Sequence, residues 1–294
     1  TGGIKIMVTK KNASTSKKPS SPMTADEKLT RRKLDALKRG IHRITESETT
    51  PFSVHVLGVG KAGADVVAQI LKDKAANPEG DEAGFTALAV DIGDEHLAQV
   101  RELASKLPDE TAQVETLALE MPSRDNLFNT LRRMREFLKL EYPRYYWNPN
   151  YEPWLPSKTE LPEQGGHCSR AVAKAIYAKS YYDDSREMRS ALRRFSDSVD
   201  NSPGQSVVAV VFGLGGGTGS GMTVDLARHL SSVAFGRRVL VVGIAIAPCD
   251  GDEEIHKGSH LFPALNELDC MGDESKNEGV VAVWGDLYRN PFTS

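Results

Sequence analysis

Cysteine is scarce in this chain, and its spacing argues against two kinds of site. The sequence contains only Cys168, Cys249 and Cys270, which lie far apart and form no CxxC pair. This pattern disfavours a disulfide framework and a cysteine-based zinc site, and it is typical of a reducing compartment. We therefore expect a cytoplasmic protein.

Long apolar runs and a strong net charge are also missing. No stretch is apolar enough to span a bilayer, and no signal-peptide pattern opens the sequence. Lys and Arg number 37 against 40 Asp and Glu, which gives a net charge of −3. The sequence therefore predicts no specific nucleic-acid partner and no electrostatic attraction to a membrane.

Glycine, in contrast, is concentrated in the stretch VVAVVFGLGGGTGSGM at 207–222. The apolar run from Val207 to Phe212 predicts a strand buried on both faces, and apolar residues at helical spacing from Met222 onward predict a helix. Thr218 and Ser220 interrupt the glycines between these two elements. The glycines are Gly213, Gly215, Gly216, Gly217, Gly219 and Gly221.

A strand, a glycine loop and a helix in this order are typical of a phosphate-binding site. Glycine admits positive φ and lets a ligand approach the backbone, and the loop and helix N–H groups together favour an anion. A flexible hinge is the alternative, but hinges seldom separate a buried strand from an amphipathic helix. The stretch is not a P-loop, because no Lys follows the glycines. We interpret it as a site for a nucleoside di- or triphosphate.

The string GGGTGSG at 215–221 resembles the signature of the tubulin/FtsZ superfamily, where this loop wraps the phosphates of a guanine nucleotide. The resemblance implies GTP or GDP and Mg²⁺ as cofactors. It also implies a GTPase that assembles head to tail into filaments, with hydrolysis completed by a neighbouring subunit. On this resemblance the chain is identified as a divergent, prokaryotic tubulin-like protein, represented by its nucleotide-binding domain alone.

Strands are expected near residues 53, 86, 114, 207, 239 and 280, with helices between most of them. This alternation predicts an α/β fold, with a mostly parallel sheet and helices on both faces, and the resemblance implies the Rossmann-like tubulin/FtsZ GTPase type. We divide the chain into a disordered or flexible tail at 1–23, an amphipathic helix at 24–47 and the nucleotide-binding domain at 48–294.

A second glycine turn follows the first expected strand. Gly58, Gly60 and Gly63 form GxGxxG between a strand and a helix, a weak motif that dinucleotide-binding folds share. The tubulin/FtsZ resemblance assigns this turn to the phosphates. Within it, Lys61 either approaches a phosphate or is simply exposed.

A third pair, Gly165 and Gly166, precedes an expected long helical stretch. The resemblance places a loop that contacts the γ-phosphate there, and Ser169 and Arg170 also fit that position. An Arg suits phosphate binding, although an Arg at a helix start is usually a surface residue.

Two acidic positions have open interpretations. Asp91 ends the second expected strand, where it would bind a ribose in an NAD-binding fold, lie near Mg²⁺ in a tubulin, or cap the helix expected at 95–107. Asp250 opens an acidic loop with Asp252, Glu253 and Glu254. This loop contacts the ribose according to the resemblance, or it is a solvated turn.

The segment 142–166 contains five prolines and six aromatic residues. Such a composition disfavours helix and regular strand, and it is too aromatic for ordinary disorder. We expect an ordered surface insertion that contacts a protein partner or covers the nucleotide. A loop packed on its own domain is the alternative.

Two further functions remain open on the sequence. A binding module could keep the fold and hold nucleotide without hydrolysing it. An NAD-dependent oxidoreductase would use Gly58, Gly60, Gly63 and Asp91, but it would leave the glycines after residue 212 unexplained.

Overall fold

The computed structural model describes residues 52–76, 85–108, 111–135, 138, 155–156, 158–183, 185–257, 260–272 and 292. By its internal contacts the chain divides into Thr1–Ile44 and Thr45–Ser294, and all described residues belong to the second unit. The tail expected at 1–23, the helix at 24–47, the strand near 280 and most of the insertion at 142–166 lie outside the described residues.

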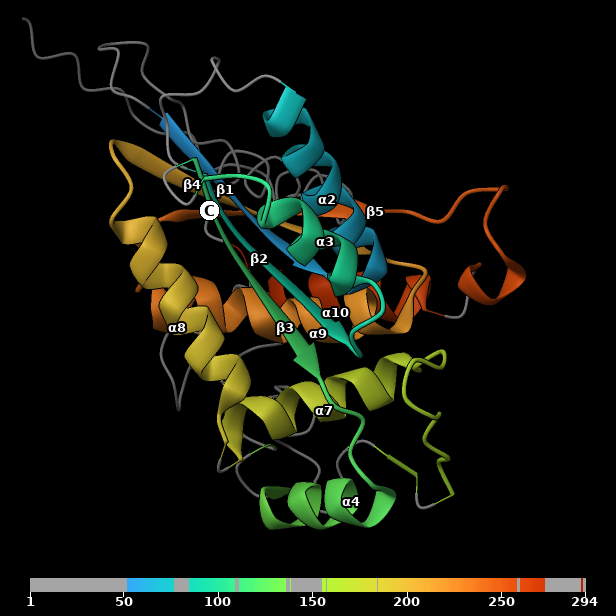
Figure 1. Ribbon diagram of the computed structural model, residues 1–294. Helices are drawn as coiled ribbons and strands as arrows, with labels where there is room; N and C mark the ends of the chain where they lie inside the picture. The colour runs from blue at the N-terminus through green and yellow to red at the C-terminus, as the bar shows by residue number, and fades with distance from the viewer. Residues whose placement is uncertain are drawn as a thin grey trace, which may run out of the picture. The chain divides into compact units, whose positions relative to one another are not determined.

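In the described part of the chain, five parallel strands form one sheet in the order β3-β2-β1-β4-β5 (Figure 1). The strands are β1 (Phe52–Val59), β2 (Phe85–Ile92), β3 (Ala112–Leu119), β4 (Gln205–Gly213) and β5 (Leu240–Ile246). These are the first five strands that the sequence predicts, so the α/β class is confirmed.

Helices follow the strands along the chain. The α-helices are α2 (Gly60–Ala76), α3 (Leu97–Ala104), α4 (Arg124–Arg133), α7 (Arg170–Tyr182), α8 (Glu187–Asp200), α9 (Gly217–Arg228) and α10 (Leu261–Gly272). A π-helical turn, η1 (His229–Ala234), continues α9, and a short 3₁₀ turn, η2 (Glu254–His256), follows β5. Among the described residues, none of these helices is both long and apolar enough to cross a membrane.

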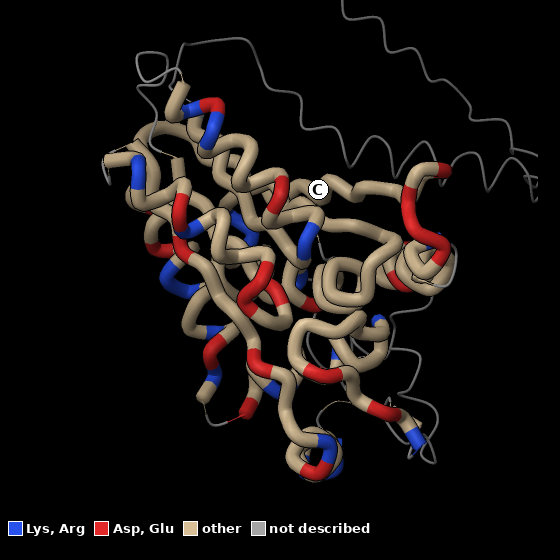
Figure 2. Tube along the Cα trace, turned by 45° about the vertical axis from the view of Figure 1, so that its right-hand side comes forward, with Lys and Arg blue, Asp and Glu red and all other residues tan. Residues whose placement is uncertain are grey.

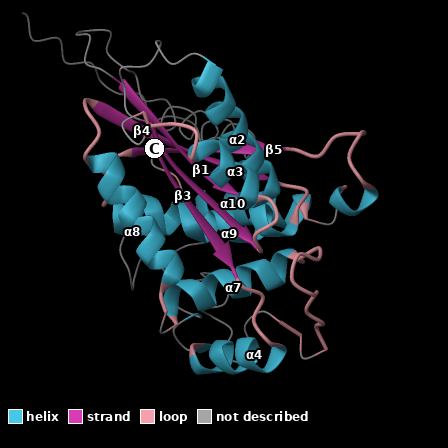
Figure 3. Ribbon diagram, viewed as in Figure 1, coloured by secondary structure: helices cyan, strands magenta, loops and turns pink. Residues whose placement is uncertain are grey.

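Both faces of the sheet are covered, and successive strand residues alternate between two cores. Val56, Ala87 and Val211 pack with α2 and α3 on one face. Leu57 and Leu88 pack on the other face with α4, α7, α8 and α9. Figure 3 shows α2 and α3 together on one side of the strands and α8 and α9 on the other. Because both faces are buried, the strands read as continuous apolar runs.

The long helical stretch that the sequence predicts after Gly166 consists of two helices, α7 and α8. Helix α7 ends at Tyr182. The next residue, Asp183, has extended backbone, and Arg186, with φ of 47°, precedes α8. Lys179 donates to the carboxylate of Asp183 at 3.0 Å, and Arg133 also pairs with it. The turn lets α8 pack on β2 and β3 while α7 packs on α9.

The strand order reverses between β1 and β4. The chain runs outward from β1 to β2 and β3, then returns to place β4 on the other side of β1. Open α/β sheets bind ligands where the carboxyl ends of strands meet such a reversal. Here Gly60 and Gly213 stand at the carboxyl ends of the two central strands.

A buried group of charges connects α7, α9 and α10. Lys174 donates to Asp225 at 2.6 Å and to Glu267 at 2.5 Å, and Arg170 pairs with Glu267. Arg228 also donates to Asp225, at 3.2 Å. Burial alone would raise the pKa of Asp225, but the charges of Lys174 and Arg228 outweigh it and lower the pKa to about 2. The carboxylate is therefore ionised at all ordinary pH values.

Other charged residues lie mainly at the surface. Basic and acidic residues are interspersed over most of the trace in Figure 2, whereas the loop that follows β5 is mainly acidic. Exposed ion pairs such as Arg194 with Glu115 link neighbouring elements. Such exposed pairs contribute little to stability compared with the buried group.

Asp225→Asn should destabilise the protein strongly, because it leaves the ammonium of Lys174 and the guanidinium of Arg228 with less negative charge to neutralise them. Loss of one partner in a buried pair typically costs about 3–5 kcal/mol. Urea unfolding followed by circular dichroism measures this free energy. Glu115→Gln, which breaks an exposed pair, is the control and should cost less than about 1 kcal/mol. Equal effects of the two variants would contradict the structural importance of the buried group.

Candidate functional site

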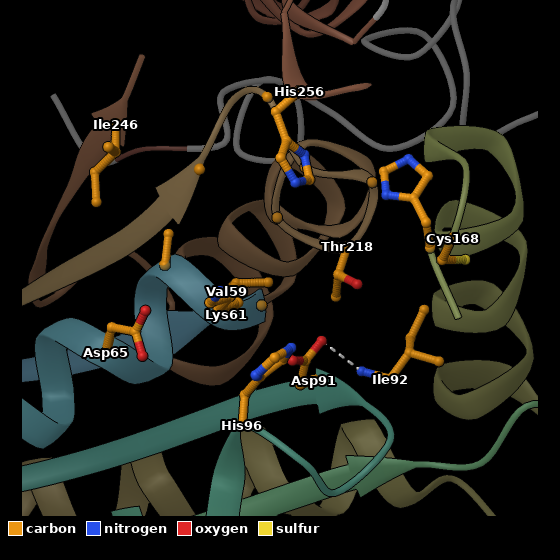
Figure 4. Close-up of a pocket in the computed structure, with 18 of the residues that line it drawn as sticks. Val59, Lys61, Asp65, Asp91, Ile92, His96, Cys168, Thr218, Ile246 and His256 are labelled. Carbon is orange, nitrogen blue, oxygen red and sulfur yellow. Dashed lines mark hydrogen bonds between the residues drawn. The ribbon is translucent and has the colours of Figure 1, made fainter. Parts of the chain in front are cut away.

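A cavity of about 730 Å³ opens at the point where the strand order reverses. Segments from the ends of β1, β2, β4 and β5 line it, together with the loop before α7 and the turn η2. In Figure 4, Asp91 and His256 lie on opposite sides of this cavity with Thr218 between them. The cavity therefore gathers loops that are far apart in the sequence.

Most of the residues that the sequence singles out line this cavity. They are Gly60, Lys61, Asp91, Gly165, Gly166, Gly213, Gly215, Gly216, Gly217, Thr218 and Gly219. The three glycine turns recognised in the sequence are thus brought together at one place.

Other predicted residues do not line the cavity, among them Gly58, Gly63, Ser220, Gly221 and Asp250. A Cβ on Gly63 would lie 2.6 Å from backbone atoms of Gly58 and Val211, so these glycines let α2 pack directly on the strands. A Cβ on Gly221 would lie 2.5 Å from the carbonyl oxygen of Arg170 on α7. The hydroxyl of Ser220 donates back to the Gly216 carbonyl at 2.5 Å.

Helix α9 begins at Gly217, inside the glycine stretch, and not at Met222 as the apolar spacing predicts. Glycine is a poor helix former, so tertiary packing decides this boundary. A Cβ on Gly217 would come within 1.5 Å of the Cys168 carbonyl oxygen, whereas a Cβ on Gly216 would meet nothing within 4 Å. Gly216 thus faces open space, while Gly217 allows the helix start to touch the loop before α7.

The first turn of α9 carries no side-chain cap, since its N-cap residue is Gly216. On the opposite side, α2 begins at Gly60 with φ of +70°, and a Cβ there would lie 3.1 Å from the Gly219 nitrogen. The starts of two helices therefore meet at the cavity. Uncapped N–H groups and the positive ends of helix dipoles favour an anionic ligand.

Asp91 is the buried carboxylate of the site, with 4% of its surface exposed. Burial raises its pKa above the usual carboxyl range. Hydrogen bonds from the Ile92 amide, at 2.8 Å, and from Thr218 lower the pKa, but burial outweighs them. A cation near this carboxylate would favour its ionised form.

Ser169 and Arg170 do not line the cavity. The hydroxyl of Ser169 caps α7 by accepting from the Val172 amide at 3.4 Å. Arg170 turns toward Glu267 on α10 in the buried charge group. Ser169 therefore caps the start of α7, and Arg170 connects α7 to α10.

Several residues line the cavity that the sequence does not single out as site residues. They are Asp65, Glu95, His96, His167, Cys168 and His256. Two of them could have been found from the sequence, because they lie beside predicted site residues. His167 follows Gly166, and Asp65 lies one helical turn after Lys61. Cys168 is buried, which raises the pKa of its thiol to about 12 and keeps it protonated.

The two adjacent glycines at the start of α9 should respond differently to alanine. Gly217→Ala forces backbone apart and should lower the free energy of unfolding by about 1–3 kcal/mol or more. Gly216→Ala adds a methyl group in open space, so its effect should stay within about 1 kcal/mol. Thermal unfolding of both variants checks this, and similar losses would contradict the placement of the helix start.

Comparison with known proteins places the chain in a family. The model of a family described as "Tubulin like" matches residues 56–279. No curated protein matches the sequence. Similar solved structures include CetZ2 from Haloferax volcanii, described as a GTPγS-bound protofilament, which has 19% identity and a TM-score of 0.43 over 81% of this chain and 56% of that one.

Two other solved structures are similar to the chain. CetZ1 from Haloferax volcanii, a GDP-bound monomer, has 17% identity and a TM-score of 0.40 over 78% of this chain and 48% of that one. An empty FtsZ dimer from M. jannaschii has 12% identity and a TM-score of 0.35 over 88% and 47%. The chain spans about half the length of these proteins. Since the family model covers most of the sequence, the chain belongs to the tubulin-like family, as a divergent member of the tubulin/FtsZ superfamily.

Proposed function

We propose that the cavity binds a guanine nucleotide, GTP or GDP, and that the chain is the GTPase domain of a protein that assembles head to tail with its own copies. The observation that carries this proposal is the meeting of Gly60, Gly216 and the uncapped start of α9 at one cavity. Membership of the tubulin-like family supports guanine as the base and self-association as the mode of assembly.

The backbone supplies the main interaction with the phosphates in this proposal. Gly216 leaves room for phosphate oxygens, and the N–H groups at the start of α9 donate to them. Of the described residues that line the cavity, Lys61 is the only Lys or Arg. Its ammonium, at the start of α2, is unfavourable beside the positive end of the helix dipole unless an anion lies near.

Mg²⁺ fits beside Asp91 in the same proposal. No group of three or more metal-ligating side chains occurs among the described residues. Mg²⁺ is usually held by one or two carboxylates together with phosphate oxygens and water, so a single buried carboxylate is compatible with it. The ion would neutralise phosphate charge, and Asp91 would hold it on the β2 side of the cavity.

We further propose that a neighbouring copy completes the hydrolytic site and that the assembly is cytoplasmic. The insertion at 142–166 is a candidate surface for a protein partner. Its last residues, Gly165 and Gly166, line the cavity, so a partner on this segment would lie close to the nucleotide.

The first experiment is to denature the purified protein and identify the released nucleotide by chromatography. GDP or GTP at about one per chain supports the proposal. An empty protein should then be titrated with GTP, GDP, ATP and NADH in the presence of Mg²⁺. Binding of NADH without guanine nucleotide would favour an oxidoreductase and contradict the proposal.

Lys61→Ala should weaken GTP binding by about ten-fold or more, since a hydrogen bond to a charged group contributes about 1.5–3 kcal/mol. Lys72→Ala removes an exposed lysine from the same helix and is the control. Isothermal titration calorimetry measures both affinities. Unchanged affinity in Lys61→Ala would show that the lysine only faces solvent.

GTP should increase light scattering and pelleting of the protein in which this domain occurs, and GDP should not. Release of phosphate measured in parallel separates two outcomes. Retained nucleotide with no scattering change and negligible phosphate release would favour the non-hydrolysing binding module over a filament-forming GTPase.

A further inference from the structure

Three histidines from separate segments meet beside the cavity. His167 precedes α7, His256 ends η2 and His260 precedes α10. The ring centroid of His167 lies 5.5 Å from that of His256 and 5.6 Å from that of His260. The Nε2 atoms of His167 and His260 are 3.4 Å apart. We call these three residues the histidine cluster.

The histidine cluster lies next to the glycine stretch at 213–221. A Cβ on Gly215 would lie 2.5 Å from the carbonyl oxygen of His256, so η2 packs directly on that glycine. Cys168, the neighbour of His167, makes an even closer backbone contact with Gly217, where a Cβ would lie 1.5 Å from the Cys168 carbonyl oxygen. Both His167 and His256 line the cavity, and Figure 4 shows the imidazole of His256 pointing into it toward Thr218.

The charge of the cavity wall is unusual for a site that receives several phosphates. Lys61 is its only Lys or Arg among the described residues. The carboxylates that line it are Asp65, Asp91, Glu95, Asp252 and Glu253. One Mg²⁺ ion and two helix N-termini compensate only part of this negative charge, so a bound triphosphate needs a further source of positive charge.

His167 and His260 are neutral before a ligand arrives, and the histidine cluster has an unused hydrogen-bonding atom. Burial lowers the pKa of His167 and of His260, and neighbouring histidines lower both further. The Nδ1 atom of His256 is buried and has no hydrogen-bond partner in the described part of the chain. A buried polar atom in this state gains most when a ligand supplies its partner.

We propose that His167 and His256, supported by His260, bind the terminal phosphate of the nucleotide and that the histidine cluster takes up a proton as it does so. This inference rests on the proposed function and adds a set of phosphate-binding residues to it. A phosphate oxygen accepts from the imidazolium N–H, and the proton comes from solvent. The bound anion provides the negative charge that the cluster lacks when the cavity is empty.

The groups that surround His260 oppose its protonation in the ligand-free state. His260 faces His167, His256 and Arg170, and all of these lower its pKa. Asp252 and Glu95, which line the cavity with His167 and His256, are exposed, and their charges are screened by solvent. Arg170, which is paired with Glu267, faces His260, and Asp252 faces His256 and Lys257. Glu95 and Glu253 line the same cavity.

The sign of the pH dependence follows from these pKa directions. In the free protein His167 and His260 are neutral near pH 7, whereas the bound cluster carries a proton, so binding consumes a proton. Affinity for GTP should therefore rise as the pH falls, by up to about ten-fold per pH unit for one proton. The rise should end once the pH is below the pKa values of the free histidines.

The test is calorimetric titration of the full chain with GTP and Mg²⁺ near pH 7.5, in buffers of different ionisation enthalpy. The dependence of the observed heat on the buffer gives the number of protons taken up, and we expect about one. GTP binding without proton uptake would overturn this inference and leave the proposed function intact. Absence of GTP binding would overturn both.

Two substitutions at one position separate charge from structure. His167→Asn should abolish most of the proton uptake and lower the affinity at about pH 6.5, where the imidazolium forms, more than at about pH 8.5. His167→Lys carries a fixed charge, so it should also abolish proton uptake but keep tight binding at both pH values. A purely structural role of His167 would instead weaken binding equally in both variants at every pH, which would overturn the inference.

His256→Asn repeats the test at the residue that packs on Gly215. Circular dichroism shows whether each variant folds, and the buffer dependence needs only a folded protein that still binds GTP. We expect reduced proton uptake in this variant as well. Full proton uptake in both asparagine variants would place the titrating group elsewhere and overturn the assignment.

Discussion

Direct backbone contact at the reversal of strand order is the constraint on which the rest of this structure depends. Gly63 lies against Gly58, Gly217 against Cys168, and a Cβ on Gly219 would lie 2.8 Å from the Gly213 carbonyl oxygen. No side chain fits between these segments. Because the segments touch through their backbones, two helix starts and the ends of the central strands come close enough to form one cavity.

This constraint gives the glycines two different roles that the sequence alone does not separate. A glycine that contacts a ligand and a glycine that contacts a neighbouring backbone cannot be told apart in an amino-acid sequence. The strands could be predicted, because β-branched runs buried on both faces have few other interpretations. The start of α9 at Gly217 could not, because intrinsic propensity favours a loop there and packing against the Cys168 loop overrides it. The same distinction divides Gly216, which faces the cavity, from Gly221, which faces α7.

Contacts between distant segments were the other limit of prediction. The family resemblance predicts that Gly165 and Gly166 belong to a phosphate loop, and the structure places both residues in the cavity wall. The sequence did not connect His167 with His260, which is 93 residues away and meets it only after α7 and α10 have packed. A lone histidine in a sequence has no periodicity or spacing that marks its partners. For Arg170 the sequence suggests a contact that the structure does not show. An arginine at this position fits a phosphate contact, but in the structure its side chain pairs with Glu267.

The buried charge group determines how rigidly the histidine-bearing wall is held. Helix α7 begins three residues after His167, and α10 begins directly after His260. Arg170 and Lys174 on α7 both contact Glu267 on α10, and Lys174 also reaches Asp225 on α9. Separating these helices would leave buried charges without partners, at a cost of several kcal/mol. The segments that carry His167 and His260 are therefore tied to the same helix whose first turn faces the cavity. The start of α9 and the histidine cluster thus belong to one frame of packed helices, which is the arrangement that the proposed phosphate site requires.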